Sequence, residues 1–478
     1  MESVDATPYN SRMRPEFFLF LAAYFALVLL AGLAFSRRMK SLEDFFLASR
    51  GLSAGLVFLS LTASWFGATS ILVSTDEAMK AGLGAFWIMG APAVLTVLFL
   101  AFFLARPLQL LPIMTIPDLV ELRYGRLVRH LASGLIIWYM VLLAASQMVA
   151  LGQFLRLFLG ISYVAGLGMA TAVVLVYSMT GGLRSVVFTD IVQFVLLVAG
   201  TGGLVIWLGG RGKAVADIAA RSGKERYFDL FHNFGENGLI AVSFILAWTI
   251  SPIALQRIQA ARGLGEARKG LFAAAGMLFL LYAGVTFVGM AALPLFSGET
   301  LSHPLISEVI ASKAGLWFGG VLFMAVLAAV LSTLDTAINT GALSLNRDVF
   351  NQLLPSSRIS PVAAGRLATL ILGLLAFLVA TRFQSILKTL GLSSEIMAEG
   401  LFVPGLAMIF SKRRAPAAGL LSLGLGGGYA LLSFLGAIDV LPLGLPVWPY
   451  SVPYGLALSL AGYVVGRAWS FYSGRFRL

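Results

Sequence analysis

The chain has 478 residues, of which 59% are hydrophobic and only 12% are charged. A soluble protein of this length needs more charge to cover its surface, so the composition excludes an ordinary soluble globular protein. The absence of cysteine excludes disulfides and thiolate metal sites, and we attribute the net charge of +12 to cytoplasmic loops of a membrane protein rather than to nucleic-acid binding.

Apolar stretches of about 20 residues recur along the chain, and each is long enough to cross a hydrocarbon core about 30 Å thick. The apolar/polar alternation of a membrane β-barrel is absent, so we predict an all-α polytopic membrane protein. Thirteen transmembrane helices are predicted, near residues 16–36, 53–79, 83–105, 127–158, 162–180, 186–209, 238–256, 270–294, 315–344, 361–380, 385–410, 415–437 and 449–466.

The basic residues between the predicted spans indicate how the chain crosses the membrane. With the N-terminus outside, the inner segments hold most of the Lys and Arg, including Arg37, Arg38 and Lys40 after the first span and Arg257 and Arg262 after the seventh. Such an excess marks cytoplasmic loops. We therefore predict a multi-pass protein of the cell inner (plasma) membrane, with its N-terminus outside and its C-terminus in the cytoplasm.

Two predicted spans contain sequence that disfavours a continuous helix. The second holds small and hydroxyl residues around Gly67, in TASWFGATS, and the seventh holds Ser251 and Pro252, in AWTISPIALQR. Proline removes a backbone donor, and unpaired carbonyls at membrane depth are tolerated where they line a cavity or bind a ligand. A simple proline kink is the alternative interpretation of the seventh span.

The two interrupted spans lie five spans apart, and because five is odd, equivalent helices would run in opposite directions. This spacing predicts a five-plus-five inverted-repeat core with broken helices in spans 2 and 7, which would meet at a transport site. The predicted parts are an N-terminal tail, first span and inner loop (1–52), a first five-helix repeat (53–209), an outer loop (210–237), a second five-helix repeat (238–410) and two C-terminal spans with a short cytoplasmic tail (411–478).

Acidic residues fall within predicted spans at six positions: Asp76, Glu77, Asp190, Asp335, Glu395 and Glu399. A carboxylate in hydrocarbon costs at least ~2.5–3.5 kcal/mol, so each needs a partner or a role. Ser332, Asp335 and Thr336 share one helical face, and such clustered oxygens suit a monovalent cation; hydrogen bonding of Ser and Thr to their own helix is the alternative. We place Glu395 at the outer interface and Glu399 in the membrane, where it would bind a cationic group or hold a proton.

Three stretches together carry a family resemblance: GGLRSVVFTDIVQF (181–194), AAVLSTLDTAINTGALSLNRDVF in the ninth span, and PIALQRIQAARGLGEARKG leaving the seventh. In this order and spacing they resemble the sodium:solute symporter family, whose members transport proline, pantothenate, sugars, choline and sialic acid. The resemblance covers nearly the whole chain. It implies the inverted-repeat fold and Na+ as the coupling ion.

The resemblance also implies where Na+ would bind. Carried over residue by residue, the principal Na+ site consists of the carbonyls of Ala63, Phe66 and Ala329 and the hydroxyls of Ser332 and Thr333. All the side-chain oxygens that this site requires are present.

Some members of the family bind a second cation, and the matching residues here are Asp190, Asp335 and Thr336, with Ser332. This chain departs from the pattern because Asp335 replaces a hydroxyl residue. Two carboxylates near one small site would repel each other, so either a second Na+ or a proton would relieve them.

The solute pocket matches the family less closely. Sugar-transporting relatives carry polar side chains where this chain has Met89 and Phe244, so the resemblance argues against a sugar. The candidate pocket residues are Trp65, Ser70, Gln147, Trp248, Ser251 and Glu399.

The sequence therefore predicts a secondary active transporter that couples inward Na+ movement to uptake of a small organic solute by alternating access. An amino acid, organic acid, vitamin or amine is expected. One alternative is a proton-coupled symporter of the same fold that uses Asp335 or Glu399, and another is a transporter-like sensor. A membrane enzyme is disfavoured because neither a catalytic Ser–His arrangement nor a metal motif such as HExxH is found. The expected partners are the solute and the lipid bilayer, with no prediction of oligomeric state.

Overall fold

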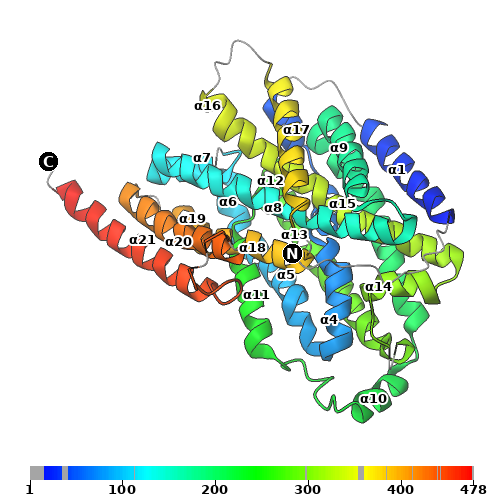
Figure 1. Ribbon diagram of the computed structural model, residues 1–478. Helices are drawn as coiled ribbons and strands as arrows, with labels where there is room; N and C mark the ends of the chain where they lie inside the picture. Colours follow the sequence, from blue (N-terminus) through cyan, green and yellow to red (C-terminus); the bar gives the residue numbers. More distant parts are fainter. Residues whose placement is uncertain are drawn as a thin grey trace.

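The computed structural model describes residues 15–34, 41–111, 113–296, 299–353, 360–383, 385–411, 413–438, 440–441 and 443–475. Within these ranges the protein is entirely helical, with no β-strand and one isolated bridge between Leu52 and Ala261 (Figure 1). The predicted inner-loop residues Arg37, Arg38 and Lys40 lie outside the described ranges.

Several helices are long and apolar enough to span a membrane, which confirms the all-α, multi-pass prediction. In the described part of the chain there are nine: Glu16–Ala34, Thr69–Leu110, Arg126–Leu159, Tyr163–Leu208, Leu264–Leu295, Leu316–Phe350, Pro361–Ala380, Ile386–Phe410 and Pro416–Ala437. A bent pair, Phe234–Thr249 with Pro252–Ala260, makes a tenth if it counts as one span. The count of thirteen spans stays a prediction.

Two predicted spans, 162–180 and 186–209, follow each other without a loop. They form α9 (Tyr163–Leu208), which is helical throughout except at Gly182, where φ is +54° and ψ is −145°. Glycine adopts this conformation at no steric cost, and here a side chain would also overlap the carbonyl of Phe45. A single glycine therefore provides the change of direction for which the sequence suggested a connecting segment.

The helix breaks near Gly67, between α3 (Ala54–Trp65) and the π-helical turn η2 (Thr69–Val73), which continues into α4 (Ser74–Ala81). Phe66 ends α3 with ψ at 71°, which turns its carbonyl away from the helical direction. Gly67 allows the backbone at this break to pack closely against two side chains, because a Cβ there would lie 2.6 Å from Thr333 Oγ1 and 2.8 Å from Gln147 Oε1.

A second interruption separates α11 (Phe234–Thr249) from α12 (Pro252–Ala260), and the two axes differ by 40°. Ser251 caps α12 by accepting a hydrogen bond from the amide of Ala254 at 3.5 Å. Pro252 occupies the first turn, where its missing N–H costs nothing. That α3–α4 and α11–α12 are each one broken membrane span stays a prediction.

Helix α15 (Leu316–Ser344) forms the centre of the molecule, with nearly all of its side chains buried. It packs against α3, α9, α8 (Arg126–Leu159) and α17 (Pro361–Ala380). Helix α1 (Glu16–Ala34) lies on one flank of this core. At the opposite flank α20 (Pro416–Ala437) and α21 (Val452–Arg475) lie side by side (Figure 1).

The remaining helices complete this arrangement. They are α2 (Leu42–Leu47), α5 (Phe86–Phe99), α6 (Ala105–Leu110), α7 (Ile116–Tyr124), α10 (Gly212–Arg221), α13 (Leu264–Ala291), α14 (Leu305–Glu308), α16 (Asn351–Leu353), α18 (Ile386–Ile396), the π-helical turn η8 (Met397–Leu401) and α19 (Phe402–Phe410).

Candidate functional site

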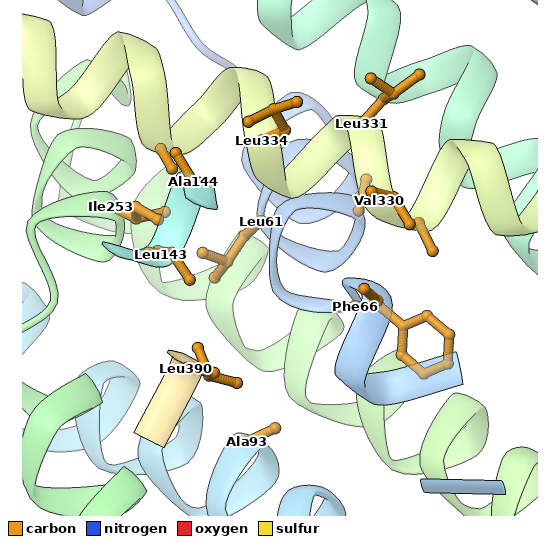
Figure 2. Packing of buried hydrophobic residues seen from close by; sticks show 14 of the residues in the cluster. Leu61, Phe66, Ala93, Leu143, Ala144, Ile253, Val330, Leu331, Leu334 and Leu390 are labelled. Carbon is orange, nitrogen blue, oxygen red and sulfur yellow. The ribbon is translucent and has the colours of Figure 1, made fainter. Parts of the chain in front are cut away.

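A cavity lies beside both interruptions, at the centre of the helix bundle. The lining residues come from the α3–η2 break, α5, α8, α11, α12, α15 and α18: Ser64, Trp65, Gly67, Thr69, Ser70, Met89, Tyr139, Leu143, Gln147, Trp248, Ser251, Ile253, Thr333 and Leu390. Figure 2 shows the packing around three of them, Leu143, Ile253 and Leu390.

The structure brings five of the six predicted pocket residues to this cavity: Trp65, Ser70, Gln147, Trp248 and Ser251. Glu399 does not line it. Among the described residues, none of those lining the cavity carries a charge, so the cavity offers a solute aromatic, apolar and neutral polar surfaces.

Aromatic rings form one wall of the cavity. The rings of Trp65 and Trp248 lie 5.7 Å apart, and Phe244 stacks on Trp248 at 4.9 Å. Behind them Trp448 packs against Phe244 at 5.7 Å and donates its indole N–H to Ser243 Oγ at 2.9 Å. Trp65 comes from the end of α3 and Trp248 from the end of α11, so both helix interruptions contribute to this wall.

The polar groups of the cavity are mostly satisfied by the protein itself. Gln147 Oε1 accepts the amide of Ala68 at 2.9 Å, and Ser70 shares a hydrogen bond of 2.7 Å with the hydroxyl of Tyr282. The buried hydroxyl of Thr69 has no partner among the described residues. Sequence reasoning missed Tyr282 and Thr69, since neither stands in a motif.

Oxygen atoms from α3 and α15 converge next to the cavity. Ser332 Oγ donates to the carbonyls of Ala63 at 2.8 Å and Ala329 at 3.1 Å. Thr333 Oγ1 donates to the carbonyls of Ser64 at 3.0 Å and Ala329 at 3.3 Å. We call these five residues the hydroxyl cluster. Every donor in it is uncharged, and all five residues are buried.

The adjacent face of the same two helices holds charged groups around Arg257. This residue is fully buried in α12, and its guanidinium donates to Thr336 Oγ1 at 2.7 Å, Ser60 Oγ at 3.2 Å and Ser64 Oγ at 3.3 Å. It also lies 3.8 Å from Asp190 Oδ2. The prediction that Arg257 belongs to a cytoplasmic loop is therefore wrong.

Asp335 completes this group, which we call the Arg257 network: Ser60, Ser64, Asp190, Arg257, Asp335 and Thr336. Asp335 Oδ2 accepts the hydroxyl of Tyr177 at 2.5 Å, and Asp190 Oδ2 accepts that of Ser60 at 2.5 Å. The other carboxylate oxygen of each aspartate has no hydrogen-bond partner in the described part of the chain. Two of the three residues predicted for a second cation site, Asp190 and Thr336, thus lie against a guanidinium.

Both glutamates of the eleventh predicted span are fully buried, so the prediction that Glu395 lies at the outer interface is wrong. Ser433 on α20 donates to Glu395 Oε1 at 2.6 Å. Glu399 faces α21, where its carboxyl group lies against Gly455. Helices α20 and α21 therefore bury Glu395, which the sequence assigned to the outer interface, and Glu399, which it assigned to the solute pocket.

Comparisons with known proteins agree over most of the chain. The model of the sodium:solute symporter family matches residues 45–427. A sodium/glucose cotransporter of Vibrio parahaemolyticus is 26% identical over 81% of this chain and 78% of its own length. A sodium/pantothenate symporter of Escherichia coli K12 is 24% identical over 95% of this chain and 97% of its own length.

A solved structure of lower sequence identity also has a similar fold. The solved structure of a Na+-coupled sialic acid symporter in a substrate-bound, outward-open state has a TM-score of 0.78 to this chain, with 18% sequence identity. The alignment covers 94% of this chain and 97% of that one. The two proteins therefore share a fold.

Proposed function

The chain belongs to the sodium:solute symporter family, and on that premise we propose that it uses the Na+ gradient to drive uptake of a small organic solute by alternating access. Members of the family are transporters, so the chain is a Na+-coupled solute transporter and not an enzyme. Its proposed location is the cell inner (plasma) membrane, with the N-terminus outside and the C-terminus in the cytoplasm.

One observation carries the proposal: the hydroxyl cluster and the cavity share residues. Ser64 and Thr333 belong to the cluster and also line the cavity, and Gly67 lies against Thr333 at the break after α3. An ion bound at the cluster would therefore fix the same backbone that shapes the solute pocket. Coupling of this kind requires that ion and solute prefer the same conformation, and the effect is reciprocal in binding free energy.

The hydroxyl cluster has the donor chemistry that a weakly held monovalent ion requires. We assign to Na+ the carbonyls of Ala63, Phe66 and Ala329 and the hydroxyls of Ser332 and Thr333. Hydroxyls and carbonyls are hard oxygen ligands without charge. Both hydroxyls now donate to carbonyls of the cluster. Na+ would replace these hydrogen bonds, because a hydroxyl group rotates freely and can turn its lone pairs toward the ion.

At the second predicted cation position we assign the positive charge to Arg257 itself. Its guanidinium contacts Thr336 at 2.7 Å and lies 3.8 Å from Asp190 Oδ2, so it neutralises a carboxylate that would otherwise need a mobile cation. On this assignment the symporter couples one Na+ to each solute molecule.

The cavity supports a solute from the classes expected above: an amino acid, organic acid, vitamin or amine. Trp65 and Trp248 present indole faces, which suit apolar groups and ammonium cations. Met89 in the lining and Phe244 behind it remove polar contacts that a sugar would need. The hydroxyl of Thr69 is one polar side-chain group of the lining that has no hydrogen-bond partner among the described residues.

Alternating access would have to open contacts on the side predicted to face the cytoplasm. There Leu52 forms a backbone bridge with the segment after α12, donating to Ala260 O at 3.0 Å and accepting from the amide of Arg262 at 3.0 Å. Glu266 accepts the first amide of α3, that of Ala54, at 2.6 Å. These contacts tie the start of α3 to α12 and α13, so inward release requires that they break.

The test is uptake into proteoliposomes that contain the purified protein. A panel of radiolabelled amino acids, organic acids, vitamins and amines is applied under an inward Na+ gradient, an inward K+ gradient or an inward proton gradient. We expect accumulation of one solute class under the Na+ gradient alone. Accumulation under the proton gradient without Na+ would instead favour proton-coupled symport, for which the unpartnered Oδ1 of Asp335 is the motivating observation.

A further inference from the structure

The segment that joins α20 to α21 brings a tryptophan to two helices that line the cavity. Trp448 lies in this segment, shortly before α21 begins at Val452. Its side chain packs with buried apolar residues of α8, α11, α18 and α20. Trp448 does not line the cavity, and α20 and α21 follow both of the predicted five-helix repeats. The proposed function therefore gives this residue no role.

Two contacts attach the indole of Trp448 to α11. Its N–H donates to Ser243 Oγ at 2.9 Å, and its ring lies 5.7 Å from that of Phe244. Ser243 and Phe244 are both fully buried. Phe244 stacks on Trp248, whose ring lies 5.7 Å from that of Trp65. A continuous series of four aromatic rings thus runs from the segment between α20 and α21 to the wall of the cavity.

The same indole lies against the backbone of α18. Gly391 allows this contact, because a Cβ at Gly391 would lie 2.4 Å from Cδ2 and Cε3 of Trp448. The residue before it, Leu390, lines the cavity. Helices α11 and α18 also pack against each other. One side chain therefore contacts both the helix that carries Trp248 and the helix that carries Leu390.

The side chain of tryptophan suits such a connection. It is large and rigid, its ring packs favourably on other rings at about 4.5–7 Å, and its buried N–H usually finds a partner. Protein interiors are close-packed, so they transmit a displacement from one side chain to the next. Removal of the indole would leave a void beside α11 and α18 and would free both helices to move relative to each other.

We propose that Trp448 is a positioning residue of the solute pocket, through which the segment between α20 and α21 ties α11 to α18. The inference rests on the proposed function, because it takes this cavity as the solute site. Trp448 acts on the solute through Phe244, Trp248 and Leu390 and does not touch it. The C-terminal helices, which lie outside the predicted repeats, thereby help to set the shape of the pocket.

The first test needs neither solute nor Na+. The chain has no cysteine, so Leu143→Cys places a single thiol in the lining of the cavity. The rate at which a charged methanethiosulfonate reacts with this thiol is measured on the full-length protein in detergent. Loss of the connection should open the cavity more often, so we expect Trp448→Ala to accelerate labelling by about fivefold or more. Trp448→Phe keeps part of the ring packing and should give an intermediate rate.

Two further variants in the Leu143→Cys background make the result specific. Trp138→Ala removes another half-buried tryptophan, which packs against Phe434 of α20 at 5.3 Å, and should leave the labelling rate unchanged. Ser243→Ala keeps the indole but removes its hydrogen-bond acceptor, so a smaller acceleration is expected; this variant decides the question if Trp448→Ala does not fold.

A second readout separates positioning from a general loss of stability. In proteoliposomes, KM for the panel compound that the wild-type protein accumulates should rise about tenfold or more in Trp448→Ala, because the groups that shape its pocket are displaced. The Na+-specific rise in melting temperature should persist, because the hydroxyl cluster is intact. A loss of both would indicate a merely structural role and would overturn the proposal.

The proposal is also overturned if Trp448→Ala labels no faster than Leu143→Cys alone, or if Trp138→Ala accelerates labelling equally. A wild-type protein that accumulates no compound under a Na+ gradient would instead refute the proposed function. The labelling rates would then still decide whether Trp448 ties α11 to α18.

Discussion

The hydroxyl cluster and the Arg257 network occupy adjacent faces of the same contact between α3 and α15, yet their chemistry is opposite. In the cluster Ser332 and Thr333 meet backbone carbonyls, and no group is charged. In the network a guanidinium that the protein itself supplies lies 3.8 Å from Asp190, and Asp335 accepts a hydrogen bond from Tyr177. A site without charge holds a mobile monovalent ion weakly enough to release it, whereas a site with its own cation is permanently occupied. This difference is our reason for proposing that the hydroxyl cluster, and not the Arg257 network, binds the coupling Na+.

Ser64 connects the two regions. Its carbonyl accepts the hydroxyl of Thr333 at 3.0 Å, while its hydroxyl lies 3.0 Å from Thr336 Oγ1 and 3.3 Å from the guanidinium of Arg257. Ion binding at the hydroxyl cluster would therefore act on the network through one residue. The network, in turn, fixes the last turn of α3, where Ala63 provides one of the carbonyls that we assign to Na+.

The largest effect on stability is expected from removing the protein's own cation. Arg257→Gln leaves Asp190 buried without its charged partner, and breaking a buried pair in this way costs about 3–5 kcal/mol. Chemical denaturation of the detergent-purified protein measures the loss. Arg262→Gln is the matched control, because Arg262 is exposed and should change stability little. Equal stability of both variants would show that the network does not depend on the guanidinium.

Removing a hydroxyl from the cluster should weaken Na+ binding more than it weakens the fold. A hydrogen bond or ligand contact to a charged group is worth about 1.5–3 kcal/mol, so Ser332→Ala should raise the Na+ concentration for half-maximal uptake by about tenfold or more. Thr369→Ala is the control, since Thr369 is a buried threonine whose hydroxyl bonds, within the described part of the chain, to its own helix at Gly365 O. An unchanged Na+ dependence in Ser332→Ala would remove the cluster from the coupling mechanism.

Replacing the unusual aspartate should have a moderate effect. Asp335→Asn keeps an acceptor for the hydroxyl of Tyr177 but removes one negative charge, so we expect a change in stability of about 1–3 kcal/mol. The Hill coefficient for Na+ should stay near one, because Arg257 still balances Asp190. A Hill coefficient of two in the wild-type protein that falls to one in Asp335→Asn would show instead that Asp335 binds a second Na+. Thr340→Ser, on the same helix, serves as the control.

The smallest effect is expected where charges are exposed. Glu77 and Lys80 form an ion pair of 3.0 Å near the end of α4, with most of the lysine side chain in solvent. Exposed pairs contribute about 0.2–1 kcal/mol, so Glu77→Gln should lower stability within that range and leave Na+ dependence unchanged. A loss comparable to that of Arg257→Gln would show that burial is not what distinguishes the network.

The sequence predicted the helical class, the helix interruptions near Gly67 and Pro252, and five of the fourteen residues that line the cavity. Those predictions succeed because hydropathy, glycine and proline act locally. The sequence did not reveal the place of Arg257, since an arginine near the end of an apolar stretch is usually interfacial. Its partner Asp190 lies 67 positions earlier, and such a pairing leaves no periodic signal.

The surroundings of Glu395 and Glu399 could not be predicted from local sequence either. Their spacing placed them one turn apart, as the structure also has them. Which surface covers that turn depends on α20 and α21, whose packing against η8 is set by tertiary contacts with Gly426 and Gly455. Local pattern therefore located the acids along the helix but not the side toward which they point.

The central claim is that Na+ binds at the hydroxyl cluster, and the most direct measurement needs no solute. Thermal stability of the detergent-purified protein is compared in NaCl, KCl and choline chloride, for the wild-type chain and for Thr333→Ala. We predict a rise in melting temperature that is specific for Na+ and that Thr333→Ala abolishes. The absence of a Na+-specific rise in the wild-type chain, or an equal rise in Thr333→Ala, would contradict the assignment.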